Sequence, residues 1–214
     1  YLFLLKPYLY SISNNNKIIM TKIHKIIKIQ NDNFITKFQF INSNRNTKIL
    51  TLDKIDFGWV DTPFGRALIM KNEIGLCGLA FTDEFGQKFA LNDMKKKWPN
   101  TSFFENFEAV KEYYKIIVSG SGELWLHLNG SLFQLKVWEE LLNIPIGHTK
   151  SYSEISNNIG MPKATRAVAN AIGCNPICWL IPCHRVLRKS GMLGGYRWGI
   201  SIKNKILNHE NISS

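Results

Sequence analysis

Cysteine and long apolar runs are both scarce in this chain. Only four of its 214 residues are cysteines, too few and too unevenly spaced for the disulfide framework of a small secreted protein: Cys77, Cys174, Cys178 and Cys183. The apolar stretch at residues 1–5 is broken at once by Lys6 and Pro7, whereas a membrane-spanning helix needs about 20 apolar residues. The composition therefore argues against a membrane partner and favours a reducing compartment, cytoplasmic (near the nucleoid) in a bacterium or nuclear in a eukaryote.

Acidic side chains are also in deficit. The 16 Asp and Glu residues face 27 Lys and Arg residues, which gives a formal net charge of +11 and a pI near 9.5. A surplus of this size favours an anionic partner, and a polyanion such as DNA is the simplest candidate. Charge alone does not distinguish DNA from an acidic membrane surface or an acidic protein.

Three of the cysteines lie close enough together to be weighed as a zinc site. The spacing is Cys174-x3-Cys178-x4-Cys183-His184, and thiolates and imidazoles are the usual zinc ligands. Structural zinc sites favour two separate ligand pairs, and here the second pair is missing. We therefore predict no metal.

The first 48 residues carry no clear fold signal. They are rich in Asn, Ile and Lys, and they show no turn or cap that defines an element. Alternating Ile and Lys fits an exposed strand, but the same composition arises from nucleotide bias. The chain starts at Tyr1 and Met20 lies downstream, so we expect either a fragment of a longer protein or a true start at Met20. We interpret residues 1–48 as disordered or as part of such a fragment.

Residues 49–129 are predicted to form an α+β subdomain. Short β-branched and aromatic runs separated by turns indicate strands at 55–60, 65–70, 74–81 and 123–128. Helical periodicity indicates helices at 84–96 and 103–117. Cys77 falls inside a strand, where free cysteine is usually a small buried hydrophobe.

Residues 130–214 are predicted to be mainly helical. Ser131 can cap a helix through Leu142, with Trp138 on its buried face. Ser151-x-x-Glu154 is a capping box that opens a second, short helix. A turn at 160–162 leads to a third helix at 163–172, closed by Gly173. The last two helices form a helix-turn-helix or an ordinary helical hairpin.

The stretch Ile181-Pro182-Cys183-His184-Arg185-Val186 places a thiol beside an imidazole and a fixed positive charge. A cysteine nucleophile acts as thiolate, and its free pKa of about 8.5 leaves little thiolate at neutral pH without such help. A glycine-rich loop, Gly191-Met192-Leu193-Gly194-Gly195-Tyr196, follows. We predict a reactive nucleophile at Cys183.

The motif resembles that of a known family. Pro182-Cys183-His184-Arg185-Val186, with Asn175-Pro176 before it and Gly194-Gly195-Tyr196-Arg197-Trp198-Gly199 after it, is similar to the acceptor-cysteine motif of the O6-alkylguanine-DNA alkyltransferases, or methylated-DNA–protein-cysteine methyltransferases. The resemblance runs from about Asp56 to Glu210 and is closest to the carboxyl-terminal half of the bacterial adaptive-response proteins. The zinc domain and the regulatory DNA-binding domain that precede this half in those proteins are not recognisable here.

This resemblance implies a fold and an activity. The fold would be α+β, with a ribonuclease H-like α/β subdomain at 49–129 and a winged helix-turn-helix-like catalytic domain at 130–214. The activity would be irreversible, single-turnover transfer of the alkyl group from O6-methylguanine, and O4-methylthymine, to Cys183. No cofactor is implied, and a monomer acting on double-stranded DNA is expected.

The resemblance also implies roles for individual residues. Cys183 would accept the alkyl group, His184 would take the thiol proton through a water, Glu210 would orient His184, and Asn175 would tie the hinge before the acceptor. For DNA binding and flipping of the target base it implies Tyr152, Thr165, Arg166 and Ala167. Tyr152, Val186, Tyr196 and Arg197 would line the substrate pocket. Arg197 stands where other members carry a small residue such as serine, but Arg197-Trp198 matches the adaptive-response form.

Three other functions fit parts of the pattern. The first is a lesion-binding protein without transfer, which the presence of Cys183 disfavours. The second is a cysteine hydrolase built on Cys183, His184 and Glu210, which would turn over. The third is a transcriptional regulator that uses only the helix-turn-helix, which a sequence-specific footprint would reveal.

Overall fold

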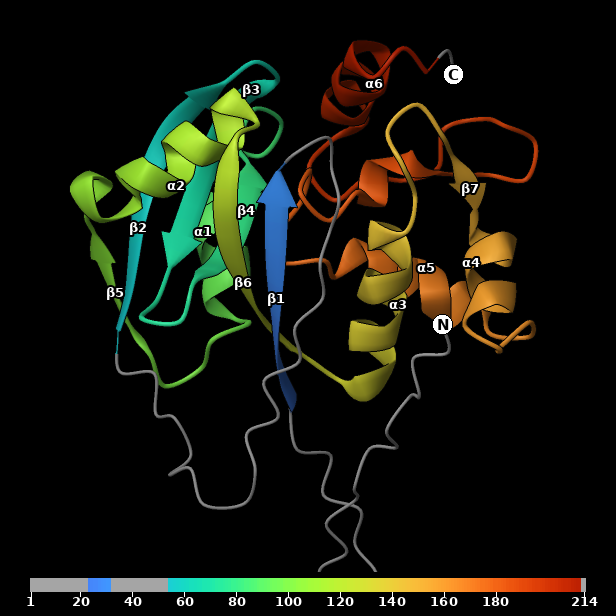
Figure 1. Ribbon diagram of the computed structural model, residues 1–214, viewed down its shortest axis with the longest axis horizontal. Helices are drawn as coiled ribbons and strands as arrows, with labels where there is room; N and C mark the ends of the chain where they lie inside the picture. The colour runs from blue at the N-terminus through green and yellow to red at the C-terminus, as the bar shows by residue number, and fades with distance from the viewer. Residues whose placement is uncertain (1–22, 32–53, 213–214) are drawn as a thin grey trace, which may run out of the picture.

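The chain folds as a mixed α+β protein, with a large sheet in its amino-terminal half and helices in its carboxyl-terminal half (Figure 1). The computed structural model describes residues 23–31 and 54–212. The strand order across the sheet is β1-β6-β4-β3-β2-β5. These strands are β1 (Ile23–Asn31), β2 (Lys54–Thr62), β3 (Gly65–Lys71), β4 (Leu76–Phe81), β5 (Ser102–Glu105) and β6 (Gly122–Gly130).

The central strands form where the sequence predicts them. β2 and β3 make an antiparallel hairpin, and β3 pairs antiparallel with β4. The third predicted strand begins at Leu76 and not at Ile74. The side-chain oxygen of Asn72 accepts the N–H groups of Ile74 and Gly75 at 3.0 and 3.1 Å, and these bonds hold both residues in a turn.

β1 comes from the segment that lacks a clear fold signal. It pairs antiparallel with the full length of β6, from Ile23 opposite Gly130 to Asn31 opposite Gly122. The alternating Ile and Lys of this stretch suit a strand at the edge of a sheet. The rest of the segment interpreted as disordered, residues 1–22 and 32–48, lies outside the described residues, as does Met20.

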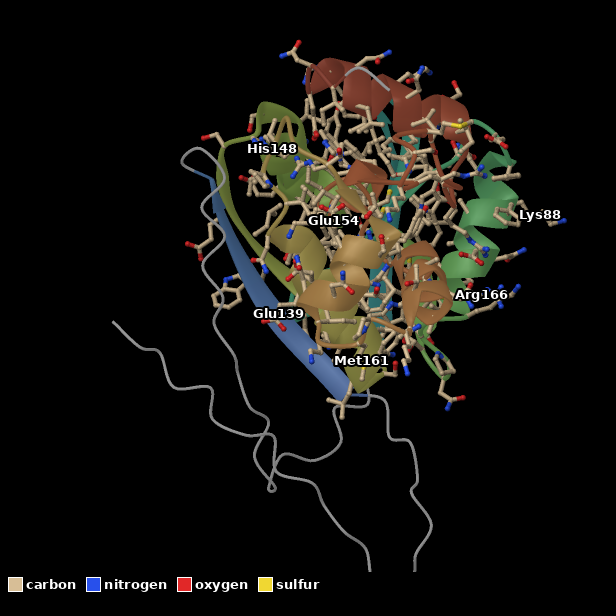
Figure 2. All side chains as sticks on the ribbon, turned by 90° about the vertical axis from the view of Figure 1, so that its right-hand side faces the viewer. Lys88, Glu139, His148, Glu154, Met161 and Arg166 are labelled. Carbon is tan, nitrogen blue, oxygen red and sulfur yellow. The ribbon has the colours of Figure 1, made fainter. Side chains whose placement is uncertain are left out.

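Two helices, α1 (Gly86–Lys95) and α2 (Phe107–Ser119), cover opposite faces of the sheet (Figures 1 and 2). The start of the helix predicted at 103–117 is wrong. Residues 102–105 form β5, which pairs parallel with β2, because Asn106 ends the strand and caps the helix. Its side chain accepts the N–H of Ala109 at 3.2 Å.

The carboxyl-terminal half is built from four helices and a two-stranded ladder among the described residues. The helices are α3 (Leu132–Leu142), α4 (Tyr152–Asn158), α5 (Thr165–Gly173) and α6 (Ile200–His209), and the ladder pairs β7 (Lys150–Ser151) with β8 (Val186–Leu187). One turn of 3₁₀ helix, η1 (Cys183–Arg185), lies directly before β8. No helix in the described part of the chain is long and apolar enough to cross a membrane.

The predicted caps account for most of these boundaries. Ser151 and Glu154 form the predicted capping box, and Ser131 forms a second box with Gln134. The third helix begins at Thr165 and not at Lys163, because the chain is still turning: the N–H of Ala164 donates to the carbonyl of Met161 at 2.8 Å. Gly173 is the last helical residue, and Cys174 caps the helix.

The two halves share one continuous core. Ile177, in the hinge after α5, forms a parallel bridge with Leu79 of β4. Leu79 donates to the carbonyl of Pro176 and accepts from the N–H of Cys178, both at 3.0 Å. The chain leading to Cys183 is therefore hydrogen-bonded to the amino-terminal sheet. Trp138 and Cys77 are buried in this core, as predicted.

Candidate active site

Cys183 is the first residue of η1 and is 7% exposed. It follows Pro182, and its N–H donates to the carbonyl of Ile181 at 2.7 Å. The acceptor thus lies in a tight 3₁₀ turn directly after a proline, which has no N–H to donate. Burial raises the pKa of the Cys183 thiol, while Asn175, the Lys203 ammonium and the Tyr196 hydroxyl lower it. The thiol needs a base before it can react.

His184 is completely buried, and its Nε2 lies 3.0 Å from Oε1 of Glu210. Burial lowers the pKa of His184, and the hydrogen bond to Glu210 opposes that shift. An ionised carboxylate only accepts hydrogen bonds, so Nε2 carries the proton of the neutral ring. The lone pair is then on Nδ1, a buried atom with no hydrogen-bond partner among the described residues. His184 is a neutral base with a free lone pair.

Glu210 caps the end of α6 and is held by Arg185 from the turn of Cys183. Arg185 Nε and Nη2 donate to the two carboxylate oxygens at 2.8 and 2.7 Å, and Nη1 donates to the carbonyl of Ile144 at 2.6 Å. Burial alone would raise the pKa of Glu210, but the hydrogen bonds from Arg185 and His184 outweigh burial and lower the pKa to about 2. Glu210 therefore stays ionised.

Asn175 is buried in the hinge between α5 and η1. Its Nδ2 donates to the carbonyl of Ile181 at 2.9 Å, and its Oδ1 accepts the N–H of Ile177 at 3.0 Å. The side chain thus ties the two ends of the hinge that leads to Cys183. Its interaction with the thiol lowers the pKa of Cys183.

Two tyrosines approach the thiol. The buried hydroxyl of Tyr196 lies beside Cys178 and Cys183, and burial raises its pKa further than either thiol does. Tyr152, the first residue of α4, is half-buried; burial and then Cys183 raise its pKa, and Arg188 lowers it. A Cβ added to Gly194 would lie 2.4 Å from the hydroxyl of Tyr152. Only a glycine lets the glycine-rich loop pack against this tyrosine.

Of the residues expected at the DNA, Tyr152 begins α4, and the other three lie on α5. Thr165 is half-buried, and its hydroxyl lies 3.2 Å from that of Ser156 on α4. Arg166 and Ala167 are exposed. Figure 2 shows Arg166 on the outer side of α5, on the same side of the molecule as Lys88 of α1.

The remaining pocket residues point in different directions. Val186 is buried in β8, and its carbonyl accepts from Lys203 Nζ at 2.6 Å. The side chain of Arg197 pairs with Asp93 of α1. The alternative zinc ligands do not converge: Cys174 is exposed, and no group of three potential ligands suited to a metal occurs among residues 23–31 and 54–212.

Lys203 is the site residue that the sequence analysis misses. It is completely buried on α6, and burial lowers its pKa to about 8 while Cys183 raises it. Lys203 lowers the pKa of both Cys183 and His184. Its position carried a signal, because it precedes Glu210 by two helical turns and so lies on the buried face of α6.

A cavity of about 440 Å³ lies between the start of α4 and the turn after β8. Its lining includes three basic side chains, Lys150, Arg188 and Lys189. Lys150 also pairs with Glu140 at 2.8 Å. Arg188 and Lys189 are exposed. The lining also includes Glu154, whose carboxylate accepts from Ser151 in the capping box.

Comparison with known proteins gives relatives over most of the chain. The family described as "6-O-methylguanine DNA methyltransferase, DNA binding domain" matches residues 132–212. The bifunctional transcriptional activator/DNA repair enzyme Ada of Escherichia coli is 33% identical over 162 residues, which are 73% of this chain and 45% of that protein. The chain thus spans about half the length of this relative.

Shorter relatives match over nearly their whole length. The methylated-DNA–protein-cysteine methyltransferase of Methanosarcina barkeri is 39% identical over 152 residues, which are 71% of this chain and 94% of that protein. The crystal structure of Mycobacterium tuberculosis OGT in complex with DNA superposes with a TM-score of 0.58 at 32% identity, covering 72% of this chain and 92% of that one.

Proposed function

Because the chain belongs to the methylated-DNA–protein-cysteine methyltransferase family, we propose that it repairs alkylated DNA by direct reversal. Sγ of Cys183 attacks the alkyl carbon on O6 of guanine, or on O4 of thymine. The S–C bond forms as the C–O bond breaks, and the base leaves with that electron pair and takes up a proton. The thioether is not hydrolysed, so each molecule acts once and needs no cofactor.

The observation that carries this proposal is the neutral, buried His184 between Cys183 and Glu210. The thiol has a raised pKa and must lose its proton. Nδ1 of His184 accepts that proton through a bridging water, and Glu210 stabilises the imidazolium through Nε2. Lys203 stabilises the thiolate.

Tyr152 donates a hydrogen bond to the leaving base. Its raised pKa keeps the phenol protonated at neutral pH, so the hydroxyl can donate to the guanine ring. Backbone N–H groups near Arg197 donate to O6 as negative charge develops there. The buried Val186 and the ring of Tyr196 form the walls of the pocket.

DNA binding uses a winged helix-turn-helix-like arrangement in residues 130–214, beside a ribonuclease H-like amino-terminal subdomain. α4 and α5 form the helix pair, and the turn after β8, closed by the hydrogen bond from Arg188 N–H to the carbonyl of Met192, forms the wing. The small residues Thr165 and Ala167 allow close approach to the duplex. Arg166 fills the stack after the target base is flipped out.

The partner is double-stranded DNA that contains O6-alkylguanine, bound by a monomer in the cytoplasm or nucleus. The net charge of +11 supports a polyanionic partner. The chain spans 45% of the E. coli relative, and the transcriptional activity named for that protein forms no part of this proposal.

A duplex with a single O6-methylguanine tests the proposal. After incubation, the peptide that contains Cys183 should gain the mass of one CH2 unit, in a one-to-one ratio and without turnover. Cys183→Ala should abolish this gain while leaving DNA binding intact, because the thiol makes no phosphate contact. Binding to the lesion without any mass gain in the wild type would instead support a non-catalytic lesion-binding protein.

A further inference from the structure

Arg197 connects the glycine-rich loop to the amino-terminal half of the protein. Its Nη2 donates to Oδ1 of Asp93, and its guanidinium carbon lies 5.8 Å from the centre of the Phe89 ring. Phe89 and Asp93 are four residues apart on α1, so they share one face of that helix. The guanidinium thus has an ionic and an aromatic partner on a single helix.

The surroundings of Asp93 make Arg197 its necessary counter-charge. The side chain of Asp93 is 10% exposed, and its Oδ2 is buried with no hydrogen-bond partner in the described part of the chain. Among the described residues the cation paired with Asp93 is Arg197, and a buried carboxylate that loses its cation is costly. The next glycine of the loop lies against the same helix start, because a Cβ on Gly199 would meet Glu84 at 1.9 Å.

α1 is also attached to the hinge at the end of α5. Nζ of Lys97, two residues beyond α1, donates to the carbonyl of Cys174 at 3.0 Å. Cys174 caps α5. α1 and the residues at its ends therefore connect the loop around Tyr196 to the end of the helix that carries Arg166.

We propose that Arg197 is a positioning residue, which clamps the pocket loop, residues 194–198, to α1 and so holds Tyr196 beside Cys183. This inference rests on the proposed function of Cys183. The clamp acts mainly on the base-binding side of the pocket, because Asn175 and η1 position Cys183 separately. It reaches the thiol through the Tyr196 hydroxyl, which lowers the pKa of Cys183. Loss of the clamp should weaken binding of the base more than it alters the thiol.

The experiment compares Arg197→Ala, Asp93→Asn and the double variant with Arg66→Ala. Arg66 is the matched control, because it pairs with Asp61 at 3.5 Å on the surface. Three measurements are made on the whole 214-residue chain of each variant: hydrogen exchange of residues 192–199, methyl or benzyl transfer from free O6-methylguanine or O6-benzylguanine, and alkylation of Cys183 by iodoacetamide.

Each clamp variant should lose hydrogen-exchange protection in the loop, and its half-saturating base concentration should rise about tenfold. Iodoacetamide should alkylate Cys183 somewhat more slowly, because Tyr196 no longer lowers the pKa of the thiol, but this loss should be smaller than the loss of base binding. The double variant should be no worse than the single ones. Arg66→Ala should match the wild type. Arg197→Lys should restore part of the loss, because it keeps the charge but not the planar contact with Phe89.

Unchanged loop protection in Arg197→Ala would overturn the clamp. Equal losses of transfer and of iodoacetamide reactivity would also overturn it, because they would indicate a general structural role. If the wild type itself does not transfer the alkyl group, the proposed function fails. In that case the hydrogen-exchange and iodoacetamide measurements still show whether Arg197 holds the pocket loop against α1.

Discussion

Oε1 of Glu210 lies 3.0 Å from Nε2 of His184, and this contact determines which ring nitrogen is free to accept a proton. The carboxylate can only accept, so Nε2 keeps its hydrogen and Nδ1 keeps its lone pair. The same carboxylate is bound by Arg185 through both of its oxygens. Orientation of the base and retention of the negative charge thus depend on one residue at the end of α6.

Glu210→Gln should slow alkyl transfer about a hundredfold or more. The amide can donate to Nε2, which stabilises the tautomer with the proton on Nδ1 and removes the acceptor for the thiol proton. Single-turnover transfer to Cys183 from free O6-benzylguanine is the measurement. Glu73→Gln, at an exposed glutamate in the turn before β4, is the control and should leave the rate unchanged. A normal rate in Glu210→Gln would exclude His184 as the base.

Glu210 should also govern acid stability. Its pKa is about 2 in the folded protein against an ordinary value of 4.5. A depressed carboxyl pKa contributes stability that is fully present above about pH 4.5 and is lost as the pH falls toward 2. The difference corresponds to about 3 kcal/mol. Urea unfolding between about pH 5 and pH 2 should show this loss in the wild type and not in Glu210→Gln.

Lys203→Met should separate activity from stability. Methionine fills the buried volume but removes the charge that stabilises the thiolate, so iodoacetamide should alkylate Cys183 about tenfold more slowly at neutral pH. The free energy of unfolding should not fall, because the depressed pKa of about 8 shows that burying the charged amine costs stability.

The charge of Lys203 can also be tested through the pH dependence of stability and of Cys183 alkylation. The unfolded chain binds more protons than the folded one between pH 8 and 10.5, so the wild type should gain stability as the pH rises through that window. Alkylation of Cys183 should level off near pH 8 in the wild type, as the ammonium loses its charge, and rise steadily in Lys203→Met. Identical pH profiles in the two proteins would contradict a charge effect of Lys203.

The sequence predicts local features better than long-range ones. The capping box at Ser151 and Glu154 and the hairpin of β2 and β3 depend on neighbouring residues, and the structure confirms them. The prediction that a helix starts at Phe103 is wrong. Residues 102–105 pair with β2, nearly fifty residues earlier in the chain, and so form a strand. A propensity for helix does not outweigh this tertiary pairing.

The same distinction holds at the site. Cys183 and His184 are adjacent in the sequence, and their motif is visible there. The contact of Arg197 with Asp93 spans 104 residues, and no local pattern indicates it. Lys203 could have been found from the helical spacing to Glu210, but a lysine on a buried face contradicts the usual expectation for that residue type.

Gly194→Ala should slow transfer from both duplex DNA and the free base. The added Cβ would lie 2.4 Å from the hydroxyl and 2.9 and 3.0 Å from ring carbons of Tyr152, so the ring must move. Gly195→Ala is a matched control, because a Cβ there meets nothing within 4 Å. The control should transfer at nearly the wild-type rate. Equal losses in the two variants would indicate that loop flexibility, and not contact with Tyr152, limits the reaction.

Arg166→Ala should slow repair of duplex DNA much more than transfer from free O6-benzylguanine. Only the duplex requires the target base to leave the stack, at a cost of a few kcal/mol. The exposed Arg166 lies on the outer side of α5 (Figure 2), whereas Cys183, His184 and Glu210 are buried. Single-turnover rates on both substrates, measured at several salt concentrations, make the comparison.

Two further variants decide how Arg166 acts. Arg166→Lys keeps the charge but loses the planar guanidinium that can fill the gap in the stack. If Arg166 only contacts a phosphate, the lysine should restore duplex repair, whereas a residue that fills the stack should not be replaced. Lys163→Ala, at an exposed lysine in the turn before α5, should lower the salt dependence of binding by about one phosphate contact. Its effect on the rate at saturating duplex should be small, because charge there assists binding and not base flipping.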